Sequence, residues 1–179
     1  GNGGFVQTNN TELAQKLCLV RTHGLASPEN RSQQIILGHN SRFTDLHAVL
    51  VQSQLKFLQR RLSACKKIVN QYISAFKTFP QIQVAGAWKK TEYPIYAEFL
   101  VENRDNLIKA LNSKNIECSR LYQSLHLLPN TVHKYFVVGQ QCNSEKYDKF
   151  GISLPCGPDF KQSELQYVIK SVLQFYSNL

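Results

Sequence analysis

Apolar residues recur at helical spacing over a long stretch in the middle of the chain. From Thr44 or Asp45 to about Phe76 they fall on one side of a 3.6-residue helix, and no proline interrupts the pattern before Pro80. The apolar stripe comprises Leu46, Val49, Leu50, Leu58, Leu62, Ile68, Val69, Tyr72, Ile73 and Phe76. Such a helix would span about 45 Å at 1.5 Å per residue, more than most small domains need. The pattern therefore predicts one helix that bridges two structural parts.

The residues before this helix predict a short strand, a helix and a loop. Residues 4–8 (GFVQT) are strand-like, and residues 9–24 follow with a helical apolar stripe. Asn10 or Thr11 suits the N-cap of this helix, and Gly24 suits its C-terminal end. The polar residues 25–34, which include Pro28, predict a loop.

After Pro80 the pattern becomes typical of strands. Residues 82–88 and 93–101 predict two strands, and the second alternates. One face of that strand would carry Tyr93, Ile95, Ala97, Phe99 and Val101. Residues 103–118 predict a helix with Asn103 as its cap and Asn115 in the left-handed conformation that often ends a helix.

The C-terminal third predicts two more strands and a final helix. Residues 134–138 (KYFVV) and 151–155 (GISLP) are strand-like and flank a polar stretch over 139–149. The last 19 residues place Leu165, Val168, Ile169, Val172 and Leu173 on one helix face. The order β-β-α-β-β-α predicts an α/β fold whose small α+β domain has an antiparallel or mixed sheet with helices on one side.

Composition indicates a globular protein and gives no sign of a membrane span. Of 179 residues, 42% are hydrophobic and 18% are charged, and no run approaches the ~18 apolar residues that a spanning helix needs. The first ten residues lack the basic flank and apolar run of a secretory signal. We therefore expect a cytoplasmic protein.

The cysteines and the net charge narrow the possible functions. Five cysteines lie at positions 18, 65, 118, 142 and 156 without any C-x-x-C pair, so neither a disulfide framework nor a metal site is predicted. The net charge of +9 favours anionic partners. The basic residues come in pairs and without the aromatic pattern of RNA-binding domains, which makes solvated faces a better interpretation than nucleic-acid binding.

A group of hydrogen-bond donors precedes the predicted long helix. Asn40 and Arg42 would lie beside the positive N-terminal end of that helix, where a phosphate dianion binds well. A simpler interpretation is that Asn40 forms a turn and Arg42 is solvated. Residue chemistry alone favours this simpler interpretation.

Five short motifs in order resemble the DegT-like sugar aminotransferases, a family of fold-type I pyridoxal phosphate enzymes. These motifs are the glycine-rich turn Gly1–Gly4, the R-x-H-G of Arg21–Gly24, the G-x-N-x-R of Gly38–Arg42, the pair Gln54-Leu55, and Leu154-Pro155. Asn2 stands where the family usually has glutamate, and His39 where an aromatic residue is common. The resemblance covers essentially the whole chain.

The resemblance implies that the chain is only the C-terminal half of such an enzyme. In the family, the lysine that binds the cofactor covalently and the aspartate that pairs with its ring nitrogen precede the glycine-rich turn. Both would precede Gly1, so no catalytic residue is assigned here. On this view residues 1–36 are a remnant of the large cofactor domain, residues 37–79 form the phosphate-contact loop and interdomain helix, and residues 80–179 form the small domain.

The resemblance also assigns binding roles. The family's G-x-N-x-R loop reaches across a homodimer interface, which gives Asn40, with Arg42 nearby, contacts to the pyridoxal 5'-phosphate of the neighbouring subunit. The stretch 117–129 resembles a segment near the nucleotide-sugar substrate, which gives Arg120 and His126 substrate contacts. His126 equally suits a structural histidine that is hydrogen-bonded between leucines.

Four functions remain open at this point. The first is a part of an aminotransferase that moves an amino group from an amino acid to a keto-sugar nucleotide, and the second is a dehydratase of the same family. The third is a non-catalytic binding or assembly fragment. A basic nucleic-acid binder, which would lose affinity steeply with salt, ranks last.

Overall fold

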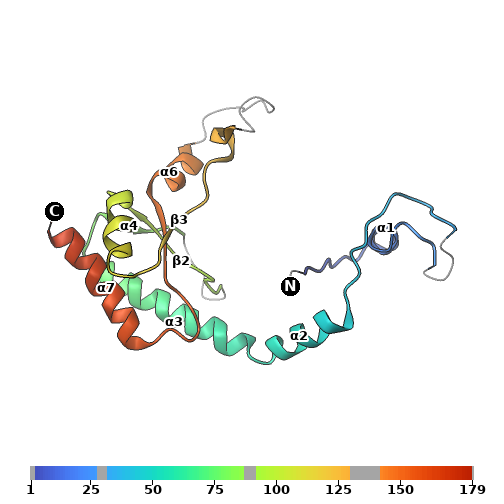
Figure 1. The fold of residues 1–179 in the computed structure, drawn as a ribbon, viewed down its shortest axis with the longest axis horizontal. Helices are drawn as coiled ribbons and strands as arrows, with labels where there is room; N and C mark the ends of the chain where they lie inside the picture. The colour runs from blue at the N-terminus through green and yellow to red at the C-terminus, as the bar shows by residue number, and fades with distance from the viewer. Residues whose placement is uncertain (1–2, 28–31, 87–91, 130–141, 179) are drawn as a thin grey trace. The chain divides into compact units, whose positions relative to one another are not determined.

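The computed structural model describes residues 3–27, 32–86, 92–129 and 142–178 (Figure 1). These residues form two compact units, Gly1–Phe57 and Leu58–Leu179, which we call the N-terminal unit and the C-terminal unit. We describe each by itself.

Two helices make up the regular structure described in the N-terminal unit. Helix α1 (Thr11–Arg21) begins at Asn10, whose side chain accepts from the Leu13 backbone N–H, as predicted. Helix α2 (Asp45–Leu55) begins at Thr44, whose side chain accepts from the His47 N–H. The strand predicted over residues 4–8 is wrong, because these residues pair with no strand in the described chain and Phe5 is 92% exposed.

A backbone ladder joins the two motif segments of this unit. His23 N–H donates to the His39 carbonyl (3.0 Å), His39 N–H donates to the Val20 carbonyl (2.7 Å), and Ser41 N–H donates to the Arg21 carbonyl (3.0 Å). In the sequence these segments are two separate motifs, Arg21–Gly24 and Gly38–Arg42. The structure makes them two sides of one local assembly.

Two glycines allow this close approach. A Cβ atom on Gly38 would lie 2.3 Å from the Gly24 nitrogen, and one on Gly24 would lie 1.7 Å from the Ile36 carbonyl oxygen. Gly24 also has a φ of +74°, which side-chain-bearing residues rarely adopt. Glycine at both positions is therefore a steric requirement of the ladder.

The N-terminal unit buries almost no apolar surface among its described residues. Thr22 and Gly24 are its buried residues, and neither carries a large apolar side chain. Its exposed apolar residues include Phe5, Val6, Ile35, Leu37, Phe43, Leu46, Val49, Leu50, Val51 and Leu55. Tertiary packing of apolar faces is the main source of helix stability in proteins, so α1 and α2 depend on their caps and local hydrogen bonds.

The C-terminal unit is built on a four-stranded antiparallel sheet. Strands β1 (Ile82–Val84), β2 (Ala97–Val101), β3 (Ser119–Arg120) and β4 (Gly151–Leu154) have the spatial order β1-β2-β4-β3. Phe99 pairs with Val84 on one side and with Ile152 on the other. Ala97, Phe99 and Val101 are buried as the alternation predicted, whereas Tyr93 and Ile95 precede the strand and Ile95 is exposed.

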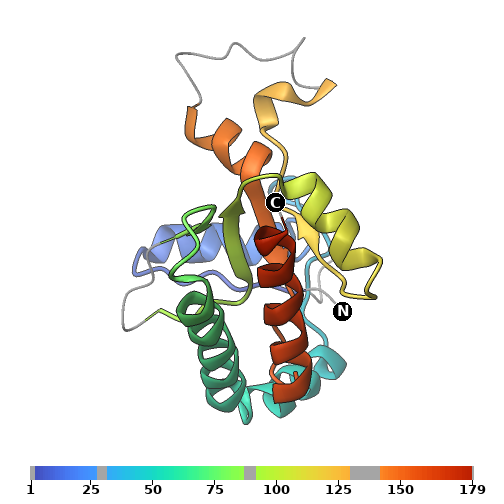
Figure 2. The ribbon, with the colours of Figure 1, turned by 90° about the vertical axis from the view of Figure 1, so that its left-hand side faces the viewer.

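Helices α3 (Leu58–Phe76), α4 (Arg104–Asn112) and α7 (Gln162–Ser177) contribute the helical part of the core (Figure 2). Tyr72 and Phe76 stack, and both meet the ring of Phe99 edge-on. The predicted stripe of the final helix is confirmed, with Leu165, Val168, Ile169 and Val172 buried. The predicted α+β layer with helices packed on one side of a small sheet is therefore confirmed.

The long helix predicted over residues 44–76 has a break. Residues Lys56 and Phe57 form a turn between α2 and α3, and the Phe57 N–H donates to the Gln54 carbonyl. The apolar stripe that predicted one helix has no member between Leu50 and Leu58. Packing on α3 begins at Cys65, so the region around the break lacks buried contacts that would hold one continuous helix.

The region between α4 and β4 differs from the prediction. The short strand β3 was not predicted, and part of the polar stretch over 139–149, for which no element was predicted, lies in helix α6 (Cys142–Phe150). The strand predicted over 134–138 lies outside the described residues. Asn103 and Asn115 both have positive φ, as expected for Asn115, but the Asn103 side chain makes no cap bond to the backbone.

No described helix is both long enough and apolar enough to cross a bilayer.

We expect the two units to differ strongly in amide hydrogen exchange. Amides of β2 and β4 are held by a buried core, whereas those of α1 and α2 open locally because little apolar contact opposes opening. Exchange measured on the 179-residue chain should show the N-terminal unit exchanging orders of magnitude faster. Equal protection of α2 and β2 would contradict this expectation.

Gly38→Ala should disrupt the ladder, at a local cost of about 1–3 kcal/mol from overpacking. The measurement is the amide chemical shifts of His23 and His39, which should move toward random-coil values. Gly4→Ala is the matched control, because a Cβ atom there meets nothing within 4 Å. Unchanged shifts in Gly38→Ala would show that the backbone tolerates the added atom.

Candidate phosphate and substrate contacts

Asn40 and Arg42 lie directly after the backbone ladder and before α2. Asn40 faces Thr22 in an isolated antiparallel bridge, and Arg42 Nε donates to Asn40 Oδ1 at 3.2 Å. Both side chains are exposed. The structure therefore brings together the two residues that the sequence singled out here.

The donors of this pair suit a phosphate. With Oδ1 engaged by Arg42, the Asn40 amide nitrogen remains a donor, and the guanidinium keeps its two terminal NH₂ groups. Thr44 caps α2 two residues later, which places the positive end of the helix dipole close by. The segment thus combines an amide donor and a guanidinium with the carboxylate of Asp45 in the first turn of α2.

Arg120 is held by a carboxylate that the sequence analysis did not identify. Its guanidinium makes an ion pair with Asp105 at 2.9 Å, and Asp105 also pairs with Arg104 at 2.9 Å. The hydrogen bond from Arg104 lowers the pKa of the Asp105 carboxyl below its usual value, and the charges of Arg104 and Arg120 lower it further. Arg120 remains 61% exposed, so part of its guanidinium is accessible.

His126 is also oriented by a carboxylate. Its Nε2 lies 3.0 Å from Oε1 of Glu145 on α6, and the His126 side chain is 16% exposed. An ionised carboxylate only accepts hydrogen bonds, so the pair places the hydrogen on Nε2 and leaves Nδ1 to other contacts. This orientation of the His126 ring is compatible both with a structural histidine and with a histidine that contacts substrate.

Helix α6 holds this segment at a second point. Asp148 lies one turn after Glu145, and its carboxylate accepts from the Ser124 backbone N–H at 2.9 Å. Arg104 is 7% exposed and donates to the Asp148 carbonyl. Glu145 and Asp148 were not predicted as partners, because they lie in a polar stretch for which no element was predicted. Two acidic residues at i and i+3 are too common a pattern to reveal this role.

Arg120 and His126 thus both lie in the C-terminal unit, but they pair with different carboxylates: Arg120 with Asp105, and His126 with Glu145. Asn40 and Arg42 belong to the N-terminal unit. Burial raises the pKa of the Cys156 thiol to about 12, which argues against a nucleophilic role for this residue. Among the described residues no group of three or more potential metal ligands occurs.

Comparison with known proteins identifies the family. The model of the DegT/DnrJ/EryC1/StrS aminotransferase family matches residues 1–173. A pleiotropic regulatory protein of Geobacillus stearothermophilus is 27% identical over 180 residues, covering 98% of this chain and 48% of that protein. GDP-perosamine synthase of Caulobacter vibrioides is 26% identical over 184 residues, covering 97% and 48%.

The fold agrees with this assignment. The crystal structure of DesV from S. venezuelae superposes with a TM-score of 0.84 at 23% identity, covering 94% of this chain and 45% of that one. The chain spans about half the length of the curated relatives it matches. From the match over nearly its whole length, the chain belongs to the DegT/DnrJ/EryC1/StrS aminotransferase family.

Proposed function

We propose that this chain is the C-terminal part of a pyridoxal-phosphate-dependent aminotransferase that transfers an amino group from an amino acid to a keto-sugar nucleotide. The observation that carries the proposal is the donor pair Asn40 and Arg42, which lies between the backbone ladder and the start of α2. The family match over residues 1–173 supports the reaction class.

In this proposal the chain supplies binding groups and no covalent attachment. The cofactor, when bound, provides the electron sink for the amino-group transfer. Asn40 and Arg42 hold the phosphate of a cofactor seated in the neighbouring subunit of a homodimer. Residues 1–36 belong to the large cofactor domain, residues 37–79 carry the phosphate loop and the interdomain helices, and residues 80–179 form the small domain of a cytoplasmic enzyme.

Arg120 and His126 are the proposed contacts to the sugar nucleotide. Arg120 presents an exposed guanidinium edge suited to a phosphate or carboxylate, and Asp105 fixes its position. His126 presents Nδ1 while Glu145 holds Nε2. The matched orientation by two carboxylates supports both roles, because binding groups act best when their positions are fixed in advance.

The proposal is tested on the polypeptide that carries this chain together with the preceding half of the relatives' length. That enzyme should consume an amino acid donor and a keto-sugar nucleotide and form the amino sugar. Loss of a sugar hydroxyl without amino transfer would instead identify the dehydratase. Failure of both reactions with saturating cofactor would favour the binding or assembly fragment.

Asn40→Ala should weaken cofactor affinity in that polypeptide. A hydrogen bond to a charged group contributes about 1.5–3 kcal/mol, so the Kd for pyridoxal 5'-phosphate should rise roughly 10- to 150-fold. Fluorescence titration of the apoenzyme measures it. Asn10→Ala is the control, since it removes a side-chain cap from α1 rather than a donor of the proposed phosphate site. An equal loss in both variants would exclude a direct role of Asn40.

Glu145→Gln should release the tautomer of His126. A glutamine can donate or accept, so it no longer requires the hydrogen on Nε2. The ¹⁵N chemical shifts of the His126 ring in the 179-residue chain should then shift toward a tautomer mixture, while stability changes by only about 1 kcal/mol or less. Glu117→Gln, an exposed carboxylate outside this pair, should leave the ring shifts unchanged. Identical spectra for both variants would show that Glu145 does not orient the ring.

A further inference from the structure

The positive charge of this protein is concentrated in one segment. Residues 46–91 contain eight lysines and arginines and no aspartate or glutamate. The rest of the chain has 13 basic and 12 acidic residues, so nearly all of the net charge of +9 comes from this segment. Helix α3, which lies in it, carries Arg60, Arg61, Lys66 and Lys67 without an acidic residue.

A groove of about 460 Å³ follows the side of α3 that faces away from the core. It is lined by Ser63, Lys66, Lys67, Asn70, Gln71, Ser74 and Tyr93. The six lining residues on α3 are spaced i, i+3, i+4, i+7, i+8 and i+11, which places them along one helix face for roughly 16 Å. The buried residues Cys65, Ile68, Val69, Tyr72 and Phe76 form the other stripe of the same helix.

Contacts to other elements hold two of the lining side chains in place. Lys66 Nζ donates to the Glu92 carbonyl at 3.1 Å and lies 4.9 Å from the centre of the Tyr93 ring. Gln71 exchanges hydrogen bonds with Gln162 at the start of α7. These contacts reduce the side-chain entropy that a ligand would otherwise have to overcome.

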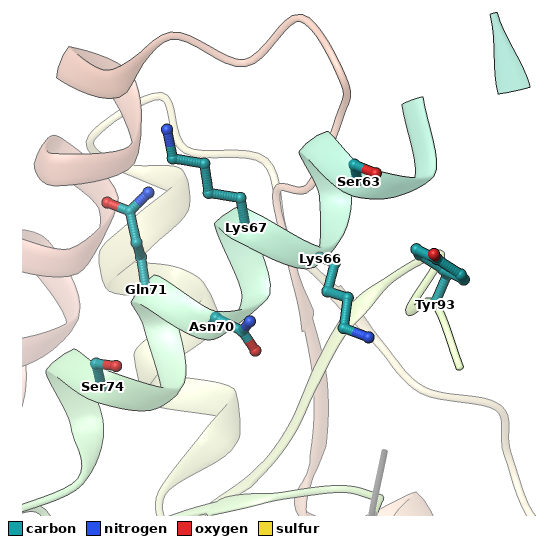
Figure 3. Close-up of a pocket in the computed structure, with 7 residues that line it drawn as sticks. All are labelled: Ser63, Lys66, Lys67, Asn70, Gln71, Ser74 and Tyr93. Carbon is teal, nitrogen blue, oxygen red and sulfur yellow. The ribbon is translucent and has the colours of Figure 1, made fainter. Parts of the chain in front are cut away.

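Ser63 and the Tyr93 hydroxyl accept hydrogen bonds from Gln59 Nε2, whereas three other lining side chains have no partner among the described residues. Figure 3 shows Asn70 between Lys66, which extends toward Tyr93, and Lys67 with Gln71 on the other side. Lys67, Asn70 and Ser74 are exposed and have no recorded hydrogen bond or ion pair in the described chain. Two ammonium groups thus flank a free amide in a concave surface.

We propose that this groove on α3 binds the oligophosphate group of a small molecule. An oligophosphate presents several anionic oxygens along a short chain, which matches ammonium, amide and hydroxyl donors arranged along one helix face. The volume lies within the range of small-molecule sites. The proposal does not depend on the aminotransferase reaction.

Two other anionic partners fit the groove less well. Single-stranded nucleic acid relies on free aromatic faces for stacking, and Lys66 already lies over the ring of Tyr93, the one aromatic residue among the described residues that line the groove. An acidic peptide needs a longer track of cations than the two lysines that line this groove in the described part of the chain. A small oligophosphate requires neither.

The test is titration of the ¹⁵N-labelled 179-residue chain with pyrophosphate at low salt. Saturable shifts of the Asn70 and Gln71 side-chain amides are expected. Lys67→Gln should weaken binding by about tenfold or more, and it keeps the contacts of Lys66 that help the C-terminal unit fold. Lys170→Gln on the exposed side of α7 is the matched control and should leave the affinity unchanged.

Each outcome decides the matter. A similar loss in Lys170→Gln, or no saturation with pyrophosphate, would overturn the proposal by showing diffuse charge attraction only. Tighter binding of an oligodeoxythymidylate or a polyglutamate peptide through the same residues would replace it with a macromolecular partner. Among supporting results, ADP binding better than pyrophosphate identifies a nucleotide as the source of the phosphates, and equal binding identifies free oligophosphate.

Discussion

The backbone contact between Gly24 and Gly38 is the constraint on which the candidate phosphate site depends. Any side chain at either position would overlap a neighbouring backbone atom. The contact allows His23 and His39 to share the ladder that ends at Ser41, next to Asn40 and Arg42. The donors are thus positioned by main-chain packing, which matters in a unit that buries no large apolar side chain among its described residues.

A different physical device positions the candidate substrate residues. Asp105 holds Arg120 and Glu145 holds His126, each through a charge-assisted contact of about 3 Å. Both acids lie on helices of the C-terminal unit, and α6 adds Asp148 as a second attachment. Helices therefore support Arg120 at the end of β3 and His126 in the segment that follows it, an arrangement that favours precise binding.

The sequence predicted the elements that have strong local signals. The stripe from Leu165 to Val172, the alternation of Ala97, Phe99 and Val101, and the left-handed Asn115 all follow from periodicity or backbone preference, and all are confirmed. The break at Lys56 and the helix α6 were missed because weak periodicity leaves their conformation to tertiary context. The carboxylate partners could not be predicted, since Asp105 and Arg120 meet only after the sheet forms.

The exposed apolar residues of the N-terminal unit have a consequence for the chain inside a cell. Exposed residues such as Phe5, Leu37 and Leu46 are the kind of surface that chaperones recognise and that promotes aggregation. Marginally held segments are also opened and cut first by proteases. A polypeptide with these apolar residues uncovered should therefore have a short lifetime in vivo, and its abundance would depend on how quickly that surface becomes occupied.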